Sequence, residues 1–127
     1  MKKVIKTDKA PAAIGPYSQG YRAGDFIFVS GQGPLNPQTG KIEGNTIQEQ
    51  TRQTLENIKA ILKADGASMG DVVKVSVLLT DLGNFKPMNE VYKTFFSEPF
   101  PARMTCGAGL ALPNMLVEID AIAYVGE

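Results

Sequence analysis

The pattern of hydrophobic and polar positions changes its period along the chain, and the first part of the pattern predicts strands. Val4 and Ile5 favour the start of a strand. Residues 11–19, which contain two prolines and a glycine, predict an extended loop. Residues 26–30 combine aromatic and β-branched side chains directly after a Gly-Asp pair, which is typical of the second strand of a hairpin. Tyr17 and Ser30 are thus expected near strand ends.

Two later segments show the spacing of helices. Thr46 and Glu49 are placed to form a capping box, and Asp65 and Gly66 give a stop signal. Between these signals the helical face consists of Ile47, Leu55, Ile58, Ile61 and Leu62. A second helix is predicted to start at Asn84 and to end before two nearby prolines. Its expected buried stripe is Phe85, Met88, Tyr92 and Phe95.

The remaining segments alternate with a period of two and predict strands. Residues 72–80 place Val73, Val75, Val77 and Leu79 on one face. Residues 116–124 do the same with Val117, Ile119, Ala121 and Ala123, while residues 105–108 give a weaker strand signal. Glu118 is therefore expected on the opposite face of the last strand.

The order of these elements predicts an α+β domain whose sheet is covered on one face by two helices. The other face would carry Leu78, Leu116 and Ile122. Because a small monomer would leave these side chains in water, we expect the chain to associate with copies of itself through this face.

Length and composition support one domain, residues 1–127, and narrow the range of partners. The chain has 43% hydrophobic and 20% charged residues, which is ordinary for a globular protein. Thirteen basic and thirteen acidic residues cancel, so no global charge favours nucleic acid or an anionic membrane. One cysteine and no histidine disfavour a disulfide or a soft-metal site. No signal peptide or membrane span is recognisable, and we expect a cytoplasmic protein without a cofactor.

Two charged residues stand out as candidates for chemistry. Without histidine, a general acid or base must come from carboxylate, tyrosine, lysine or cysteine. Arg103 follows two prolines at the start of a predicted strand, where it would grip a carboxylate in a bidentate manner or form an ion pair. Glu118 lies between apolar neighbours, so partial burial would raise its pKa toward the range of a general base; a solvated position on the strand is the alternative.

The local sequence does not distinguish Tyr17, Ser30 or Asn89 from ordinary turn or helix residues. Gly31-Gln32-Gly33 resembles part of a phosphate-binding loop, but the glycine and lysine that should follow are replaced by Pro34-Leu35, which disfavours nucleotide binding. Cys106 is more typical of a small buried hydrophobe than of a nucleophile.

Several segments, distributed in order over nearly the whole chain, closely resemble the RidA (YjgF) family. The segments that carry this resemblance are Ala13–Gln19, Val29–Gln32, Glu49–Ile58, Asn89–Tyr92, Pro101–Arg103 and Val117–Ala123.

The resemblance implies a chorismate-mutase-like α+β fold of the bacillus type, in which a mixed sheet covered by two helices forms part of a trimeric barrel. It also implies a homotrimer with active-site clefts between subunits. Arg103 would bind the substrate carboxylate and Glu118 would activate water, the two facing one another across the pocket. The matching pocket residues, expected from two subunits, are Tyr17, Ser30, Gly31, Asn89, Thr105 and Cys106.

The implied activity is the hydrolysis of 2-enamine and 2-imine intermediates, such as 2-iminopropanoate and 2-iminobutanoate, to 2-oxo acids and ammonia. A non-catalytic sensor of 2-oxo acids is the alternative, and an endoribonuclease or translation inhibitor is disfavoured by the zero net charge. The chain departs from the family pattern at Thr105, where many members have cysteine, with Cys106 one position later. Leu112-Pro113 also lies one position nearer to Glu118 than in the family pattern.

Overall fold

Six strands form one mixed sheet in the computed structural model, which describes residues 1–126. The strands lie in the order β1-β2-β3-β6-β4-β5, and only β4 and β5 pair in parallel. Their bounds are β1 Lys2–Ile5, β2 Gly20–Ala23, β3 Phe26–Gln32, β4 Val72–Leu79, β5 Ala102–Gly107 and β6 Val117–Tyr124. The predicted α+β class with a mixed sheet is confirmed.

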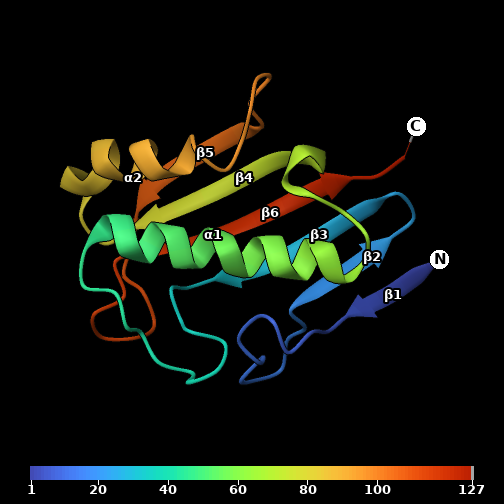
Figure 1. The fold of residues 1–127 in the computed structure, drawn as a ribbon, viewed down its shortest axis with the longest axis horizontal. Helices are drawn as coiled ribbons and strands as arrows, with labels where there is room; N and C mark the ends of the chain where they lie inside the picture. Colours follow the sequence, from blue (N-terminus) through green and yellow to red (C-terminus); the bar gives the residue numbers. More distant parts are fainter. Residues whose placement is uncertain (127) are drawn as a thin grey trace.

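Two helices cover one face of this sheet, as Figure 1 shows. They are α1, Ile47–Ala64, and α2, Phe85–Tyr92, and the short 3₁₀ helices η1, Met69–Asp71, and η2, Leu82–Asn84, lie at the two ends of β4. The capping box predicted for the start of α1 is present: the Thr46 hydroxyl accepts from the Glu49 backbone, and Glu49 accepts from the Thr46 backbone. The sequence therefore determines where α1 begins by satisfying its free backbone donors.

The hydrophobic core lies between the helices and the sheet. The predicted face of α1 is buried there, and so are the alternate positions of β4 and β6. The largest fully buried apolar side chains are Ile27, Leu55, Ile58, Ile61, Leu62, Val75, Val77, Leu79, Met88, Val117 and Ile119. Their removal from water is the main stabilising contribution within one chain.

Two expectations about buried positions were wrong. Val73 is exposed, while Val72 is buried, because the pairing of β4 with β6 is irregular between Val72 and Lys74 and inverts the alternation there. Phe85 is also exposed, and Phe95 is only partly buried beyond the end of α2. The helix is shorter than the predicted stripe.

The face of the sheet opposite the helices carries exposed apolar side chains. Phe28 of β3 pairs with Ile122 of β6, and Met104 lies on β5; Phe28 and Met104 are about half exposed. A depression of about 420 Å³ lies on this open face, between residues of β2, β3, β4 and β6. Leu78, Leu116 and Ile122 are partly buried already within one chain. Association of copies through this face stays a prediction.

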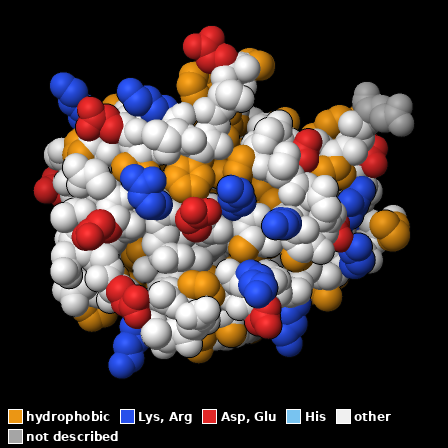
Figure 2. Space-filling model, viewed as in Figure 1, with side chains coloured by type: hydrophobic (Ala, Val, Ile, Leu, Met, Phe, Trp, Pro, Cys, Tyr) orange, Lys and Arg blue, Asp and Glu red, His pale blue; other side chains and the backbone are white. Residues whose placement is uncertain are grey.

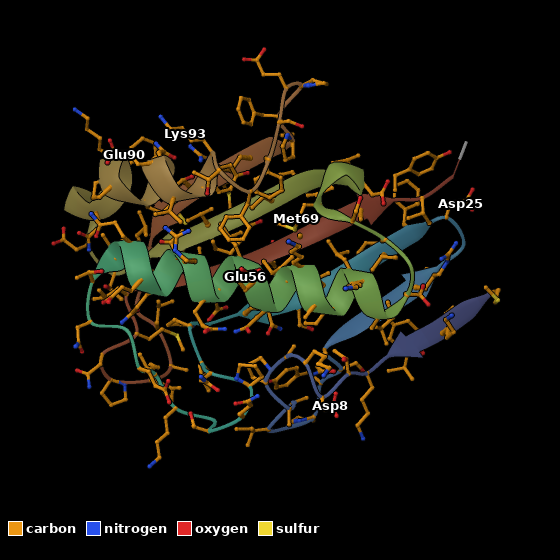
Figure 3. All side chains as sticks on the ribbon, viewed as in Figure 1. Asp8, Asp25, Glu56, Met69, Glu90 and Lys93 are labelled. Atoms are coloured by element: carbon orange, nitrogen blue, oxygen red, sulfur yellow. The ribbon has the colours of Figure 1, made fainter. Side chains whose placement is uncertain are left out.

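The helix-covered face has a mixed charge. Figure 2 shows lysine and arginine side chains interspersed with aspartate and glutamate over this side. Glu56 on α1, and Glu90 and Lys93 at α2, are exposed on the outer side of the helices (Figure 3). No helix within residues 1–126 is long and apolar enough to cross a membrane.

Asp65, directly after α1, joins the first two strands to the helical layer. Its carboxylate binds Lys3 Nζ at 2.5 Å and Arg22 Nη1 at 3.1 Å. The hydrogen bond from Lys3 is the main cause that lowers the pKa of Asp65, and burial opposes it.

Replacing Asp65 by Asn should lower the free energy of unfolding by about 1 kcal/mol at neutral pH. Because the folded pKa of Asp65 is depressed, its stabilisation is present above the unfolded value of 3.8 and is lost as pH falls through the folded pKa. Denaturant unfolding at a fixed protein concentration should therefore show that the deficit of D65N shrinks in strong acid. Glu56→Gln, on the exposed side of α1, is the matched control, and an equal deficit at all pH values would contradict the account.

Candidate functional site

Glu118 lines a pocket at the start of β6, where three loops meet. The pocket has a volume of about 350 Å³. Its walls are mostly apolar, with Tyr17 and Glu118 as the polar side chains that carry a hydroxyl or a charge; the others are Pro11, Ala12, Ile14, Gly31, Gln32, Gly33, Leu35, Ala111, Leu112 and Met115. A carboxylate in such surroundings is partly removed from water.

The absence of a side chain at Gly31 leaves space for the Glu118 carboxyl. Gly31 lies where β3 loses its regular pairing with β6, between Val29 and Gln32. A β-carbon at position 31 would approach the Glu118 carboxyl carbon to 3.1 Å and its nearer oxygen more closely still. Since the backbone conformation of Gly31 is not left-handed, a side chain at this position would act by displacing the Glu118 carboxyl and not by straining the backbone.

Burial is the main cause that raises the pKa of Glu118. The negative charge of Asp120, two residues along the same strand, adds to the rise. Both effects disfavour the ionised carboxylate. Glu118 is thus a partly buried acid whose pKa is raised, while its role as a general base stays a prediction.

Two buried polar residues of α1 hold the loops around this pocket. Gln50 donates to the backbone oxygens of Gly44 and Asn114 and accepts from the backbone of Leu116 at 2.8 Å. Asn57 donates to the backbone oxygens of Gly33 and Leu35. These bonds satisfy buried amides and fix two pocket walls relative to the helix.

Tyr17 and Ser30 lie on the same side of the molecule as Glu118. Tyr17 is half exposed and belongs to the wall of the pocket. Ser30 donates its hydroxyl to the backbone oxygen of Ser18, and its own backbone donates to the Gln19 oxygen. The loop that carries Tyr17 is thereby attached to β3, and we call Tyr17, Gly31 and Glu118 the Glu118 half-site.

Arg103 lies at the start of β5, as predicted, but its side chain turns toward α2. Arg103 Nη1 donates to Asn89 Oδ1 at 2.7 Å. The guanidinium carbon lies 4.7 Å from the centre of the Tyr92 ring and 5.6 Å from that of Phe85. An open pocket of about 510 Å³ is lined by Asn89, Tyr92, Lys93, Phe100, Pro101 and Arg103. We call Asn89, Tyr92 and Arg103 the Arg103 half-site.

Thr105 and Cys106 point to opposite faces of the sheet because they are successive residues of one strand. Thr105 pairs with Val77, which is buried beneath the helices, and the Thr105 hydroxyl is buried with no hydrogen-bond partner among residues 1–126. Cys106 pairs with Leu78, which in turn pairs with Glu118. Thr105 therefore belongs to the side of Arg103 and Cys106 to the side of Glu118.

A single chain does not bring Arg103 and Glu118 together. Arg103 pairs with Val75, and Val75 pairs with Ala121; both partners are buried on the helix side of the sheet. Glu118 points to the open side, since its neighbours Val117 and Ile119 are buried under the helices. The two half-sites thus lie on opposite faces of one sheet and line separate cavities. Their joint role stays a prediction.

Three residues around these half-sites were not singled out from the sequence. Gln50 and Asn57 form hydrogen bonds with backbone groups of residues that are distant in the sequence, and no local sequence signal indicates such partners. Tyr92 was assigned to a buried stripe only. Its spacing from Phe85 and Asn89 was the available signal, because positions 85, 89 and 92 lie on one helical face.

Within residues 1–126, no group of three or more histidine, cysteine or acidic side chains is placed to hold a metal ion.

Comparison with known proteins gives the family. The family described as Endoribonuclease L-PSP matches residues 7–125 of the chain. Two relatives illustrate the similarity. A RutC family protein of Pyrococcus horikoshii is 52% identical over 98% of both chains. TdcF of Escherichia coli, whose name describes a reactive intermediate deaminase, is 50% identical over 97% of both chains.

Solved structures agree with this match. A crystal structure from Thermotoga maritima, of a protein named as an endoribonuclease, superposes with a TM-score of 0.95 at 47% identity and covers 100% of both chains. The structure of Escherichia coli TdcF with bound serine has a TM-score of 0.89 at 44% identity, covering 96% of this chain and 98% of that one. This chain belongs to the Endoribonuclease L-PSP family, which includes the RidA and YjgF proteins that its sequence resembles.

Glu118→Gln should make the protein more stable at neutral pH, because the amide removes the cost of a partly buried charge. The folded pKa of Glu118 is raised, so the wild-type penalty is absent below the unfolded value of 4.5 and is complete above the folded pKa. Unfolding curves of both proteins should therefore diverge as pH rises and coincide in acid. A Gln variant that is less stable at neutral pH would show that the carboxylate is stabilising there. Glu90→Gln, at an exposed position of α2, serves as the control.

Proposed function

We propose that the protein hydrolyses 2-imino acids, in equilibrium with their 2-enamines, to 2-oxo acids and ammonia. The observation that carries the proposal is a partly buried glutamate with a raised pKa in one pocket and an arginine held against α2 in another. Relatives named as reactive intermediate deaminases support the reaction class. The substrates that we propose are 2-iminopropanoate and 2-iminobutanoate.

Arg103 would bind the substrate carboxylate. Its guanidinium presents parallel donors that match a carboxylate, and such charge-assisted bonds are strong and directional. Asn89 already occupies Nη1, which leaves the other donors for a ligand. Because the imine carbon is next to the carboxylate, this binding would fix the position of the electrophile.

Glu118 would activate the water that attacks this carbon. The water oxygen forms a bond to the imine carbon while the pair of the C=N double bond moves to nitrogen, and Glu118 takes the proton of the water. Glu118 returns this proton to the nitrogen, which gives a neutral tetrahedral carbinolamine. The proton of the new hydroxyl then passes through Glu118 to the amino group, the C–N bond breaks, ammonia leaves with the bonding electron pair, and the oxygen forms the C=O bond of the 2-oxo acid. The raised pKa of Glu118 makes its carboxylate a stronger base toward the water.

The two half-sites would come from neighbouring copies in a homotrimer. One chain holds Arg103 and Glu118 on opposite faces of its sheet, so it cannot present both to one small acid. A heterologous contact between copies would place the Arg103 half-site of one copy against the Glu118 half-site of the next and close a ring. The apolar open face supplies surface for that contact.

Replacing Arg103 by Ala should reduce kcat/KM for 2-iminobutanoate by about 100-fold, since the charge-assisted bonds to the carboxylate are lost. The imine is generated in place by a dehydratase, and the release of ammonia is measured above the spontaneous rate. Lys93→Ala, at the rim of the same pocket, is the control and should retain the activity within a few-fold. Equal rates for R103A and wild type would exclude the proposed clamp.

Mixed assemblies test the sharing of the site. R103A and E118Q chains with different tags are co-expressed, and assemblies that carry both tags are purified. If each site takes Arg103 from one copy and Glu118 from the next, every trimer that carries both tags has one intact site, so about a third of the sites should be restored. Assemblies of either variant alone should be inactive. If mixed assemblies are also inactive while mixed wild-type controls are active, the site is not shared in this way.

A sensor of 2-oxo acids is the second candidate, since the Arg103 pocket would bind such an anion without any reaction. A wild-type protein that binds 2-oxobutanoate through Arg103 and leaves imine hydrolysis at its spontaneous rate would support this candidate. Cleavage of RNA that persists in R103A would instead support the activity in the family's name.

A further inference from the structure

Phe85, Asn89 and Tyr92 form a cradle for Arg103 on one face of α2. The three positions are spaced by four and three residues, so they project from the same side of the helix. Asn89 accepts one hydrogen bond from the guanidinium, and the two rings lie beside the guanidinium. Of the two rings, that of Tyr92 is the nearer and the more buried, with 5% of its surface exposed against 41% for Phe85.

The hydroxyl of Tyr92 has no evident structural task. It is buried and makes no hydrogen bond within residues 1–126. Burial raises the pKa of Tyr92, and the positive charge of Arg103, together with the approach of its donors to the phenolic oxygen, opposes the rise. A buried hydroxyl without a partner costs free energy, so packing alone would favour phenylalanine at this position. Arg103 approaches the phenolic oxygen without forming a hydrogen bond of good geometry, so the ring face is the contact with Arg103 that the geometry supports.

The ring of Tyr92 is itself fixed in position. It is the last residue of α2 and packs against Phe96, with the ring centres 4.7 Å apart. The negative face of an aromatic ring attracts a cation, and this attraction grows where water is excluded. Tyr92 thus supplies a rigid, apolar support that restricts the guanidinium to the orientation in which Asn89 binds it.

We propose that Tyr92 is a positioning residue for Arg103, which acts through its aromatic face and prepares the guanidinium to receive a carboxylate. This inference rests on the proposed function, because it takes Arg103 as the group that binds the substrate. Loss of the ring should weaken ground-state binding more than the chemical step, since Glu118 lies in the other half-site.

The experiment compares four variants by imine hydrolysis and by the binding of 2-oxobutanoate. Tyr92→Leu should raise KM and the Kd of 2-oxobutanoate about 10-fold while kcat changes less than about threefold. Tyr92→Met, which keeps a flexible apolar side chain without a ring, should behave in the same way and serves if the leucine variant folds poorly. Tyr92→Phe should bind like the wild type and be at least as stable. Val91→Ala, at a buried position of α2 outside the cradle, should lose stability and keep its KM.

Comparing the effect of Y92L in the wild type with its effect in R103A separates a positioning role of Tyr92 from a purely structural one. If Tyr92 acts through Arg103, adding Y92L to R103A should leave the Kd of 2-oxobutanoate unchanged. An equal loss of binding in both backgrounds, or wild-type binding by Y92L and Y92M, would overturn the inference. These results differ from failure of the proposed function, in which the wild type neither accelerates imine hydrolysis nor loses binding when Arg103 is removed.

Discussion

The alternation of side chains across the sheet is the constraint on which the remaining features of this protein depend. Each strand sends successive residues to opposite faces, and the helices cover only one of these faces. In β6 the buried residues Val117 and Ile119 leave Glu118 on the open side, while the pairing of β5 with β4 sends Arg103 toward the helices. The sheet therefore determines which charges can meet within one chain. It keeps apart the two charged residues to which the chemistry is assigned.

Each half-site is held by a different part of the helical layer. Buried amides of α1, in Gln50 and Asn57, fix the loops around Glu118. The short helix α2 provides the polar and aromatic contacts to Arg103. The partial burial that raises the pKa of Glu118 costs stability, and the hydrophobic core compensates for it. In this account the precise placement of both charged groups requires the fold of each copy and the contact between copies.

The fold was largely predictable because its signals are local. The capping box at Thr46, the helical spacing of α1 and the alternation in β6 each involve neighbouring residues, and the structure confirms them. Val73 was assigned to the wrong face because an irregularity in β-pairing depends on the partner strand. Phe85 was assigned to the core because its spacing matches the stripe, whereas α2 turns it toward the edge of the helical layer and Arg103.

The site was predictable in part. The burial of Glu118 followed from its apolar neighbours, and the place of Arg103 at a strand start followed from the prolines before it. The face of the sheet on which Arg103 lies did not follow, because the weak strand signal at 105–108 does not give the parallel pairing of β5 with β4 or its register. The most direct test of the account is a crystal structure with bound 2-oxobutanoate. We predict that its carboxylate contacts Arg103 of one copy and that its carbonyl carbon faces Glu118 of the neighbouring copy. A ligand that contacts neither residue, or both residues of the same copy, would contradict the account.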